Sequence, residues 1–147
     1  MGIRVQNSAS VSSHFNDYLK RIDQAFQLVL ADLGMELVAL ARTMHSYTDR
    51  TGNLTNSIGY AVIKSGNILT TGGMQGGEGE AQSLDYIRTL ASQLPQQYSL
   101  VIVAGMDYAA YVEAKGYNVL LPARLAADRD FKARMDNLIS NINNRLK

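Results

Sequence analysis

The chain has 147 residues and a mass of 16.1 kDa, which is the size of one domain. Hydrophobic residues make up 46% and charged residues 18%, so the chain is too apolar to be disordered. Fourteen Lys and Arg stand against thirteen Asp and Glu, and the chain therefore lacks the basic excess that grips nucleic acid or acidic lipid. The absence of cysteine excludes disulfides, thiolate nucleophiles and Cys-ligated zinc.

The N-terminal residues predict neither a secretory signal nor a folded element. Residues 1–12 are polar and rich in serine, which predicts a loose arm. They contain no apolar core like that of a secretory signal. The longest apolar run, around 100–105, is far shorter than the ~18 residues of a membrane span. We therefore expect the chain to be made and kept in the cytoplasm, with no membrane partner.

The clearest periodic signal follows the arm, from residue 13 to about residue 44. Apolar residues recur there at steps of three and four, the pattern of an amphipathic helix. They are Phe15, Leu19, Ile22, Phe26, Val29, Leu30, Leu33, Leu37, Leu40, Ala41 and Met44. Ser12 or Ser13 is expected as the N-cap, and Gly34 as a weak point where the helix bends.

The length of this helix has a consequence for assembly. Thirty-odd residues span ~45–50 Å, whereas a compact domain of this size is ~38 Å across. Since the apolar stripe continues to both ends of the helix, either the helix bends or neighbouring chains cover the part that extends beyond the domain.

The middle of the chain predicts a small sheet. Residues 57–64 place Ile58, Tyr60 and Val62 on one face, which is the alternation of a strand. Residues 65–67 have turn chemistry, and residues 68–71 return as a second strand to make a hairpin. The run 100–104 is continuously apolar and largely β-branched, which predicts a buried central strand within 98–106.

A segment with five glycines separates these strands and predicts a mobile surface loop over 72–79. The glycines are Gly72, Gly73, Gly76, Gly77 and Gly79. Nucleotide binding is not expected, because Gln82 stands where a dinucleotide fingerprint needs a small residue and Glu78 would repel phosphate. We interpret the segment as an assembly loop that orders on contact, followed by a helix over about 80–94 that Pro95 ends.

Two further helices complete the prediction. A short helix over 108–115 stops at Gly116, and a last helix opens at Pro122 and runs to about 146. The last helix has more basic than acidic side chains, which leaves nucleic-acid binding open as an alternative function. The other interpretation is a solvated face with the pairs Asp128–Lys132 and Asp130–Arg134. The predicted fold class is α+β: one domain over 13–147, with the long N-terminal and C-terminal helices on a small mixed, mainly antiparallel sheet.

Few residues are candidates for catalysis or metal binding. His14 and His45 are expected at opposite ends of the long helix, without a further ligand at metal-binding spacing. Asp107 follows a predicted strand, where active-site acids occur, but no nucleophile pattern accompanies it and we expect it to cap the next helix. We predict no enzyme activity, catalytic residue, cofactor or metal ion. A small ligand-binding or enzymatic domain that uses the glycine segment and Asp107 is the less favoured alternative.

Two stretches resemble a known family. Residues 51–58, Thr-Gly-Asn-Leu-Thr-Asn-Ser-Ile, resemble the Thr-Gly-x-Leu-x-x-Ser-Ile element of the tail-component (tail-completion and head–tail joining) proteins of long-tailed bacteriophages. Residues 108–113, Tyr-Ala-Ala-Tyr-Val-Glu, resemble that family's Tyr-Ala-x-Tyr-Val-Glu element, and a Pro-Ala pair opens the last helix as in the family. The matching residues are Thr51, Gly52, Leu54, Ser57, Ile58, Tyr108, Ala109, Tyr111, Val112, Glu113, Pro122 and Ala123. Gly116 stands one residue later than the family's glycine.

The resemblance implies a structural virion protein of a phage or prophage. Such a protein closes the tail and joins it to the head as a ring of its own copies, with other neck and tail proteins as partners. It would occupy the host bacterial cytoplasm during assembly and the virion afterwards. A near-neutral chain also suits a conduit through which DNA slides without specific binding.

The residues of the two motifs have expected physical roles. Gly52 is expected to take the positive φ that ends the long helix, and Leu54 to fill the core at that corner. Tyr108, Tyr111 and Val112 stand on one helix face, and Glu113 points elsewhere, toward a basic group such as one on a neighbouring subunit.

Overall fold

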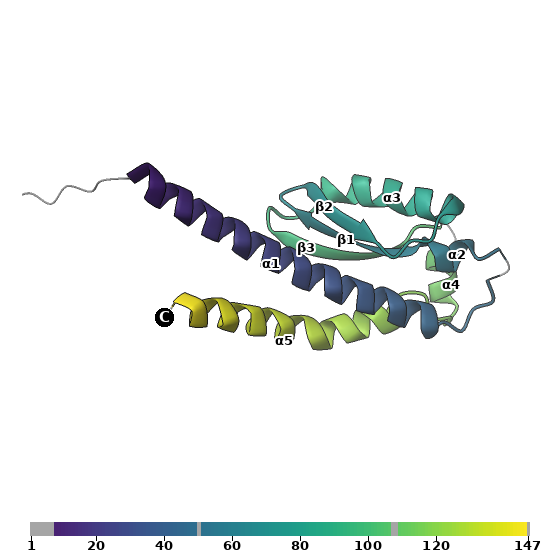
Figure 1. Cartoon of the computed structure of the whole chain (residues 1–147). Coiled ribbons are helices and arrows are strands. Elements are labelled where there is room, and N and C mark those ends of the chain that lie inside the picture. Colours follow the sequence, from purple (N-terminus) through teal and green to yellow (C-terminus); the bar gives the residue numbers. More distant parts are fainter. Residues whose placement is uncertain (1–7, 50, 107–108, 147) are drawn as a thin grey trace, which may run out of the picture.

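The computed structural model describes residues 8–49, 51–106 and 109–146. Its elements in chain order are α1 (Ser8–Thr43), α2 (Asn53–Ser57), β1 (Ile58–Lys64), β2 (Asn67–Gly72), α3 (Gly77–Ala91), β3 (Tyr98–Ala104), α4 (Ala109–Ala114) and α5 (Leu121–Leu146). Figure 1 shows three layers, with α3 on one face of the sheet and α1, with α5 beside it, on the other. This arrangement confirms the predicted α+β class and the two long terminal helices.

The sheet is antiparallel and has the strand order β2-β1-β3. The central strand is β1, in which every residue but Lys64 is buried. The prediction that residues 98–106 form the central strand is wrong, because β3 lies at an edge and most of its residues are only half-buried. Helices cover both faces of β3. A continuous apolar run indicates that both faces of a strand are covered, but it does not show whether the strand has a neighbour on each side in the sheet.

The predicted hairpin is confirmed. Ser65 and Gly66 join β1 to β2 with φ angles of 52° and 79°, as expected for the type I′ turns that fit the twist of a hairpin. Tyr60 lies opposite Gly72 and Lys64 opposite Asn67, with a register shift between Val62 and Ile63. One residue of β2 is therefore accommodated as a bulge.

The alternating side chains of β1 divide the core into two layers. Toward α1, the buried set is Leu30, Leu33, Leu37, Val38 and Ala41 of the helix with Ile58, Tyr60 and Val62 of the strand. Toward α3, Ala61 and Ile63 pack with Ile87, Ala91 and Val103. Of the stripe predicted in the second half of α1, Leu30, Leu33, Leu37 and Ala41 are confirmed as core. The prediction is wrong for Met44, which follows the end of the helix and is 53% exposed.

Helix α1 begins earlier and runs straighter than expected. It starts at Ser8, so the predicted N-cap at Ser12 or Ser13 is wrong, and residues 8–12 are helical where a loose arm was predicted. Residues 1–7 lie outside the described residues. The helix continues through Gly34 without a break. A Cβ added at Gly34 would lie 2.6 Å from the Tyr60 ring. Gly34 therefore serves close packing on the sheet.

The glycine segment is shorter as a loop than predicted. Gly72 ends β2, and α3 begins at Gly77 and ends at Ala91, so the predicted bounds of the loop and of the following helix are wrong. Gly79 is buried, and a Cβ added there would lie 2.4 Å from the Asn53 carbonyl oxygen. At Gly73, with φ +87°, an added Cβ would lie 2.9 Å from Val38 Cγ1. These two glycines let neighbouring elements approach closely, and an assembly role for the segment stays a prediction.

Candidate functional site

The Thr51–Ile58 motif forms the corner between α1 and the sheet. Asp49 holds this corner, because its carboxylate accepts hydrogen bonds from the Gly52 N–H (3.0 Å) and the Thr55 N–H (2.7 Å). Gly52 has the expected positive φ of 77°, but it precedes α2, whereas α1 ends at Thr43. The prediction that Gly52 ends the long helix is therefore wrong, and its conformation starts the short helix that leads into β1.

The apolar and hydroxyl side chains of the motif make contacts within the chain, and Leu54, Ser57 and Ile58 are buried. Leu54 is 2% exposed and packs with Tyr47, Met106, Ala109 and Val119, as predicted. The buried Ser57 hydroxyl donates a hydrogen bond to the Leu54 carbonyl (2.7 Å). The Thr51 hydroxyl accepts one from the Asn53 N–H (3.2 Å). Each of these contacts stabilises the corner itself.

Arg42, near the end of α1, also holds this corner. Its guanidinium donates to the carbonyls of Thr55 (3.3 Å), Ile58 (3.1 Å) and Gly73. Burial lowers the pKa of Arg42, although an arginine stays protonated at any physiological pH. One cation thus ties the end of α1 to the motif and to the glycine segment. No local pattern signals this contact, since its partners lie 13 to 31 residues further along the chain.

Glu113, in the second motif, has a role within its own chain. Its carboxylate accepts hydrogen bonds from the backbone N–H groups of Val119 (2.6 Å), Leu120 (2.9 Å) and Leu121 (2.9 Å). These donors stand at the start of α5, where a negative charge is favourable. The side chain thus caps the last helix of its own chain, and a contact of Glu113 with a basic group of a neighbouring subunit stays a prediction.

The other residues of the second motif are placed as follows. Ala109 is buried, and Val112 packs against the cluster around Leu54. Gly116, with φ +87°, follows α4, as predicted for a stop signal. Pro122 is the second residue of α5, and Ala123 is buried against α1. Tyr108 and the side chain of Tyr111 lie outside what the structure describes.

One hollow lies at the end of β3, between α4 and the start of α5. Its volume is about 710 Å³, and its lining includes Ile102, Met106, Ala109, Leu120 and Glu113. The Glu113 carboxylate in it is already engaged by three backbone donors. His45 is not part of this lining. Its ring stacks on Tyr47, with 4.4 Å between the ring centroids. Asp107, which the alternative of an enzymatic domain uses, lies outside the described residues.

A second hollow of about 500 Å³ follows β3 toward its start. Leu100 and Ile102 line it from β3, and Ala127 and Phe131 line it from α5. Ile102 lines both hollows, so the two run along one strand. This strand edge is therefore bordered by apolar surface over most of its length.

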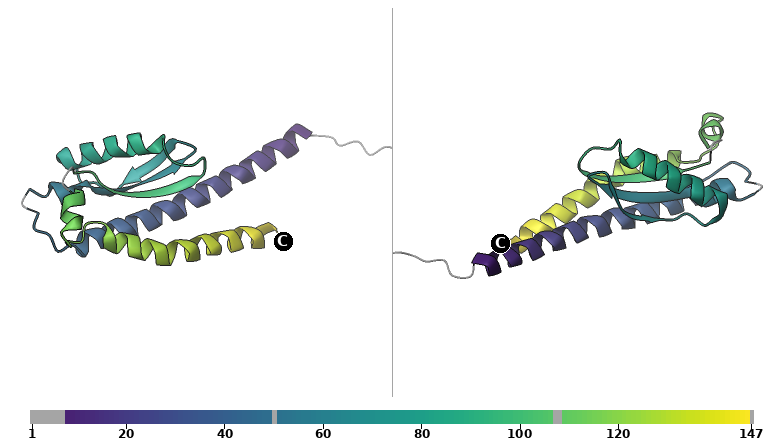
Figure 2. Two further views of the ribbon diagram at one scale, coloured as in Figure 1. Left: turned by 180° about the vertical axis from the view of Figure 1, so that it is seen from behind. Right: turned by 90° about the horizontal axis from the view of Figure 1, so that it is seen from above.

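The apolar stripe of α1 continues beyond the sheet. Figures 1 and 2 show the N-terminal part of the helix projecting past the strands; we call residues 8–22 the overhang. On it Val11, Phe15 and Leu19 are 61%, 59% and 43% exposed. The long helix therefore leaves part of its apolar face uncovered by its own chain, and such faces are usually contact surfaces.

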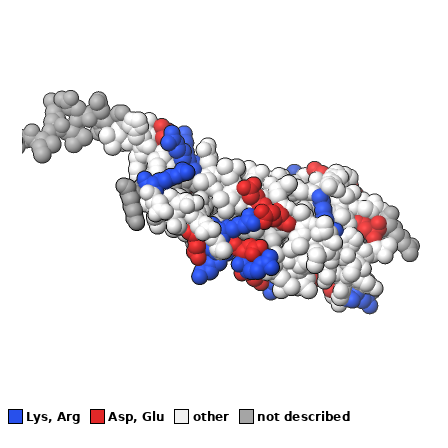
Figure 3. All heavy atoms as spheres, turned by 60° about the horizontal axis from the view of Figure 1, so that its bottom comes forward, with Lys and Arg blue, Asp and Glu red and all other residues white. Residues whose placement is uncertain are grey.

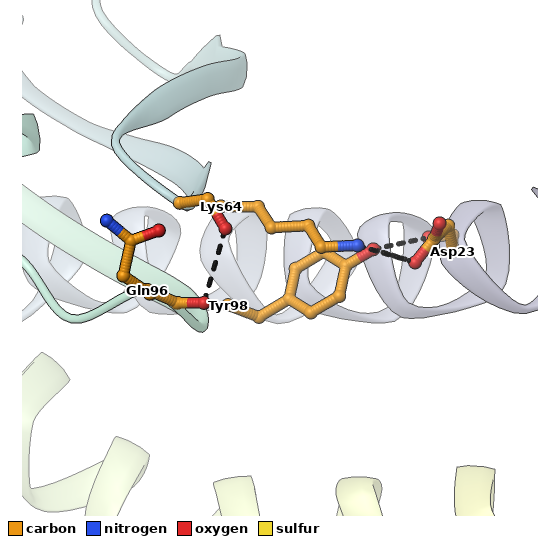
Figure 4. A network of polar contacts seen from close by, with 5 residues as sticks. Asp23, Lys64, Gln96 and Tyr98 are labelled. Atoms are coloured by element: carbon orange, nitrogen blue, oxygen red, sulfur yellow. Dashed lines mark hydrogen bonds and ion pairs between the residues drawn. The ribbon is translucent and has the colours of Figure 1, made fainter.

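A polar cluster holds α1 to the sheet where the overhang begins (Figure 4). Asp23 accepts hydrogen bonds from Lys64 Nζ (2.9 Å) and Tyr98 Oη (2.7 Å). The bond from Lys64 lowers the pKa of Asp23, and the same bond raises the pKa of Lys64. Burial raises the pKa of Tyr98, whose ring stacks on Phe26 at 5.4 Å.

The charges of α5 are interspersed and partly paired. Arg129 pairs with Asp130 (2.8 Å) and Arg134 with Glu36 of α1, so the predicted pairs Asp128–Lys132 and Asp130–Arg134 are not the ion pairs of the described helix. The bond from Arg129 lowers the pKa of Asp130. Figure 3 shows basic and acidic side chains alternating over the face that it presents. This face offers no continuous basic track for a phosphate backbone.

Within the described ranges, no three His, Cys, Asp or Glu side chains are grouped as metal ligands. Among the described helices, α1 is long and apolar enough over Val11–Thr43 to cross a membrane. The core helix of a soluble protein passes the same test of length and composition, and Leu33 and Leu37 of α1 are packed on the sheet.

Comparison of the chain with protein-family models, with curated proteins and with solved structures found no match.

Proposed function

We propose that the chain is a structural virion protein of a phage or prophage that acts in tail completion or head–tail joining by assembling into a ring. Two kinds of support are independent of each other. The Thr51–Ile58 and Tyr108–Glu113 motifs resemble the family in residue type, order and spacing. The surface of the single chain leaves apolar side chains uncovered where copies would meet.

The observation that carries the proposal is the uncovered stripe on the overhang. Val11, Phe15 and Leu19 continue the same helical stripe that Leu30, Leu33 and Leu37 bury against the sheet. Contiguous exposed apolar surface of this kind is typical of contact surfaces between proteins. A near-neutral chain with such a surface is suited to self-association, since no large net charge opposes it.

The family-like residues support the same proposal by what they do inside the chain. Gly52, Leu54, Ser57 and Glu113 hold the corner and the start of α5 through internal contacts. Such residues maintain the fold of the single chain, and other residues on the surface would make the contacts between copies. The proposal accordingly assigns this chain no catalytic group and no cofactor.

Nucleic-acid binding through α5 is the weaker candidate. Arg129 and Arg134 are engaged by Asp130 and Glu36, which leaves less free positive charge than the sequence of the helix suggests. A DNA-binding role would require affinity that falls steeply as salt rises, and we expect little binding even at low salt.

Genetic complementation tests the proposed function. Deletion of the reading frame from its phage or prophage should give, by electron microscopy, filled heads and separate tails in place of joined particles. The wild-type chain supplied in trans should restore joining, and the Phe15→Gln/Leu19→Gln variant should not. The variant Leu28→Gln/Met35→Gln is the matched control, because these two side chains are 65% and 53% exposed but lie off the stripe. Normal particles in the deletion strain would contradict the proposal.

A further inference from the structure

The sheet has two strands at its edges, and the sequences of both lack the features that normally prevent pairing. Among the described residues, β2 and β3 each pair with β1 only. The two strands read Asn-Ile-Leu-Thr-Thr-Gly and Tyr-Ser-Leu-Val-Ile-Val-Ala, without a charged residue or a proline. Edges that face solvent are usually protected by lysine, proline or a covering element, because their free N–H and C=O groups otherwise pair with another chain.

The helix layer extends past the edge formed by β3. Packed helices lie 8–10 Å apart, whereas neighbouring strands lie 4.7–4.9 Å apart. Each helix therefore covers about two strands, and a layer of two helices covers about four. This sheet has three. Helix α1 packs on all three strands, and α5 packs chiefly on α1. The hollow of about 500 Å³ between β3 and residues 127–131 of α5 lies where the helix layer extends beyond the last strand.

We propose that β3 of one copy pairs in parallel with β2 of the next copy, so that α5 underlies the joint between two sheets. This inference rests on the proposed self-assembly and specifies its contact. Both β2 and β3 are antiparallel to β1, so they run in the same direction. A rotation that sets β2 of one copy beside β3 of the next therefore preserves strand direction. Repeating such a head-to-tail contact gives a ring when the rotation divides a full turn.

We assign the strand that pairs with β3 to a second copy of the chain, because the pairing of β3 with β2 satisfies both free sheet edges of every subunit. The two edges are similar in length, at six and seven residues. Ile68 and Leu69 of β2 are each 38% exposed, and pairing beside the apolar hollows would cover them. Since the helix layer is wider than the strand layer, the joined sheets curve with α1 and α5 on the convex side, as a closed ring requires.

Disulfide trapping tests this contact directly, because the chain has no cysteine of its own. Thr71 and Val101 both lie opposite Ala61, on either side of β1. Within one copy they are thus two strand spacings apart, ~9.5 Å, beyond the 4.4–6.8 Å that a disulfide bridges between Cα atoms. In the variants Thr71→Cys/Val101→Cys and Thr71→Cys/Ser99→Cys, any disulfide must join two copies.

The expected result is a ladder of covalent multimers on a non-reducing gel, which reductant abolishes, for at least one of the two pairs. The control Thr71→Cys/Leu28→Cys should give no ladder beyond background. Efficient dimers of Val101→Cys alone would show pairing of β3 with β3 and overturn the inference. Absence of a ladder in both pairs, while light scattering shows multimers, would overturn the strand contact and leave the proposed function standing. A monomeric mass at every concentration would overturn both.

Discussion

The two halves of α1 carry one apolar stripe but meet different surroundings. Leu30, Leu33 and Leu37 are 1%, 0% and 2% exposed, because the sheet lies over them. Val11 and Phe15, on the same stripe, are about three-fifths exposed. Helical periodicity therefore identifies the face that must be covered but does not identify what covers it. In the first half of the helix, we attribute the cover to other copies of the chain.

The largest expected difference is in stability. Leu33→Ala should lower the free energy of unfolding by ~2–5 kcal/mol, because it opens a cavity in the core. Phe15→Ala should change it by less than ~0.5 kcal/mol, as substitutions at exposed positions usually do. Urea unfolding at concentrations where the chain is monomeric measures both. Similar losses for the two variants would mean that the overhang is covered within the single chain.

The close packing of Gly79 in the glycine segment is also testable by substitution. Gly79→Ala should destabilise the chain by ~1–3 kcal/mol, because the added Cβ meets the Asn53 carbonyl and the Ser57 backbone. The control Gly116→Ala introduces strain at a positive φ but meets nothing within 4 Å, and its cost should be ~1–2 kcal/mol. Thermal unfolding measures the stability of both variants. A gain in stability from Gly79→Ala, as helix propensity alone predicts, would favour the mobile loop expected from the sequence.

The cap on α5 tests the packed end of the molecule. Glu113→Gln should lower the free energy of unfolding by ~1–2 kcal/mol, because one carboxylate oxygen accepts the bonds from Val119 and Leu120 and the other accepts the bond from Leu121. Glutamine keeps only one acceptor oxygen, and its NH2 group cannot accept a bond from a backbone N–H. Asp136→Asn, an exposed change within α5, is the control and should be near neutral. An unchanged stability in Glu113→Gln with assembly lost would instead place Glu113 at a contact between copies.

The smallest effect is expected where the two halves of α1 join. Because the folded pKa of Asp23 is lowered, its contribution is present above about pH 4 and is lost as the pH falls through that lowered pKa. Because the pKa of Lys64 is raised, its contribution is present below about pH 10 and is lost as the pH rises through the raised value. The pair is exposed, so screening limits it to ~0.5 kcal/mol. Asp23→Asn should remove the acid-side slope from the pH dependence of stability, and an unchanged slope would show that Asp23 does not contribute.

Sequence analysis predicted the elements whose signal is local. The hairpin followed from alternation and turn residues, and the stripe of α1 from its period. The edge position of β3 was missed, because burial of both faces by α1 and α3 gives it the composition of a central strand. The contacts of Arg42 and Glu113 were missed for another reason. Both side chains bond backbone groups, and backbone groups leave no residue-type signal at the partner positions.

The central claim is that other copies cover the stripe on the overhang. Light scattering of the purified chain over a range of concentrations tests it most directly, with Phe15→Gln/Leu19→Gln and Leu28→Gln/Met35→Gln measured alongside. The account predicts that the wild type and the second variant reach a mass several times 16.1 kDa, and that the first variant needs at least ~10-fold higher concentration to do so. A mass of one chain for all three proteins at every concentration would contradict it.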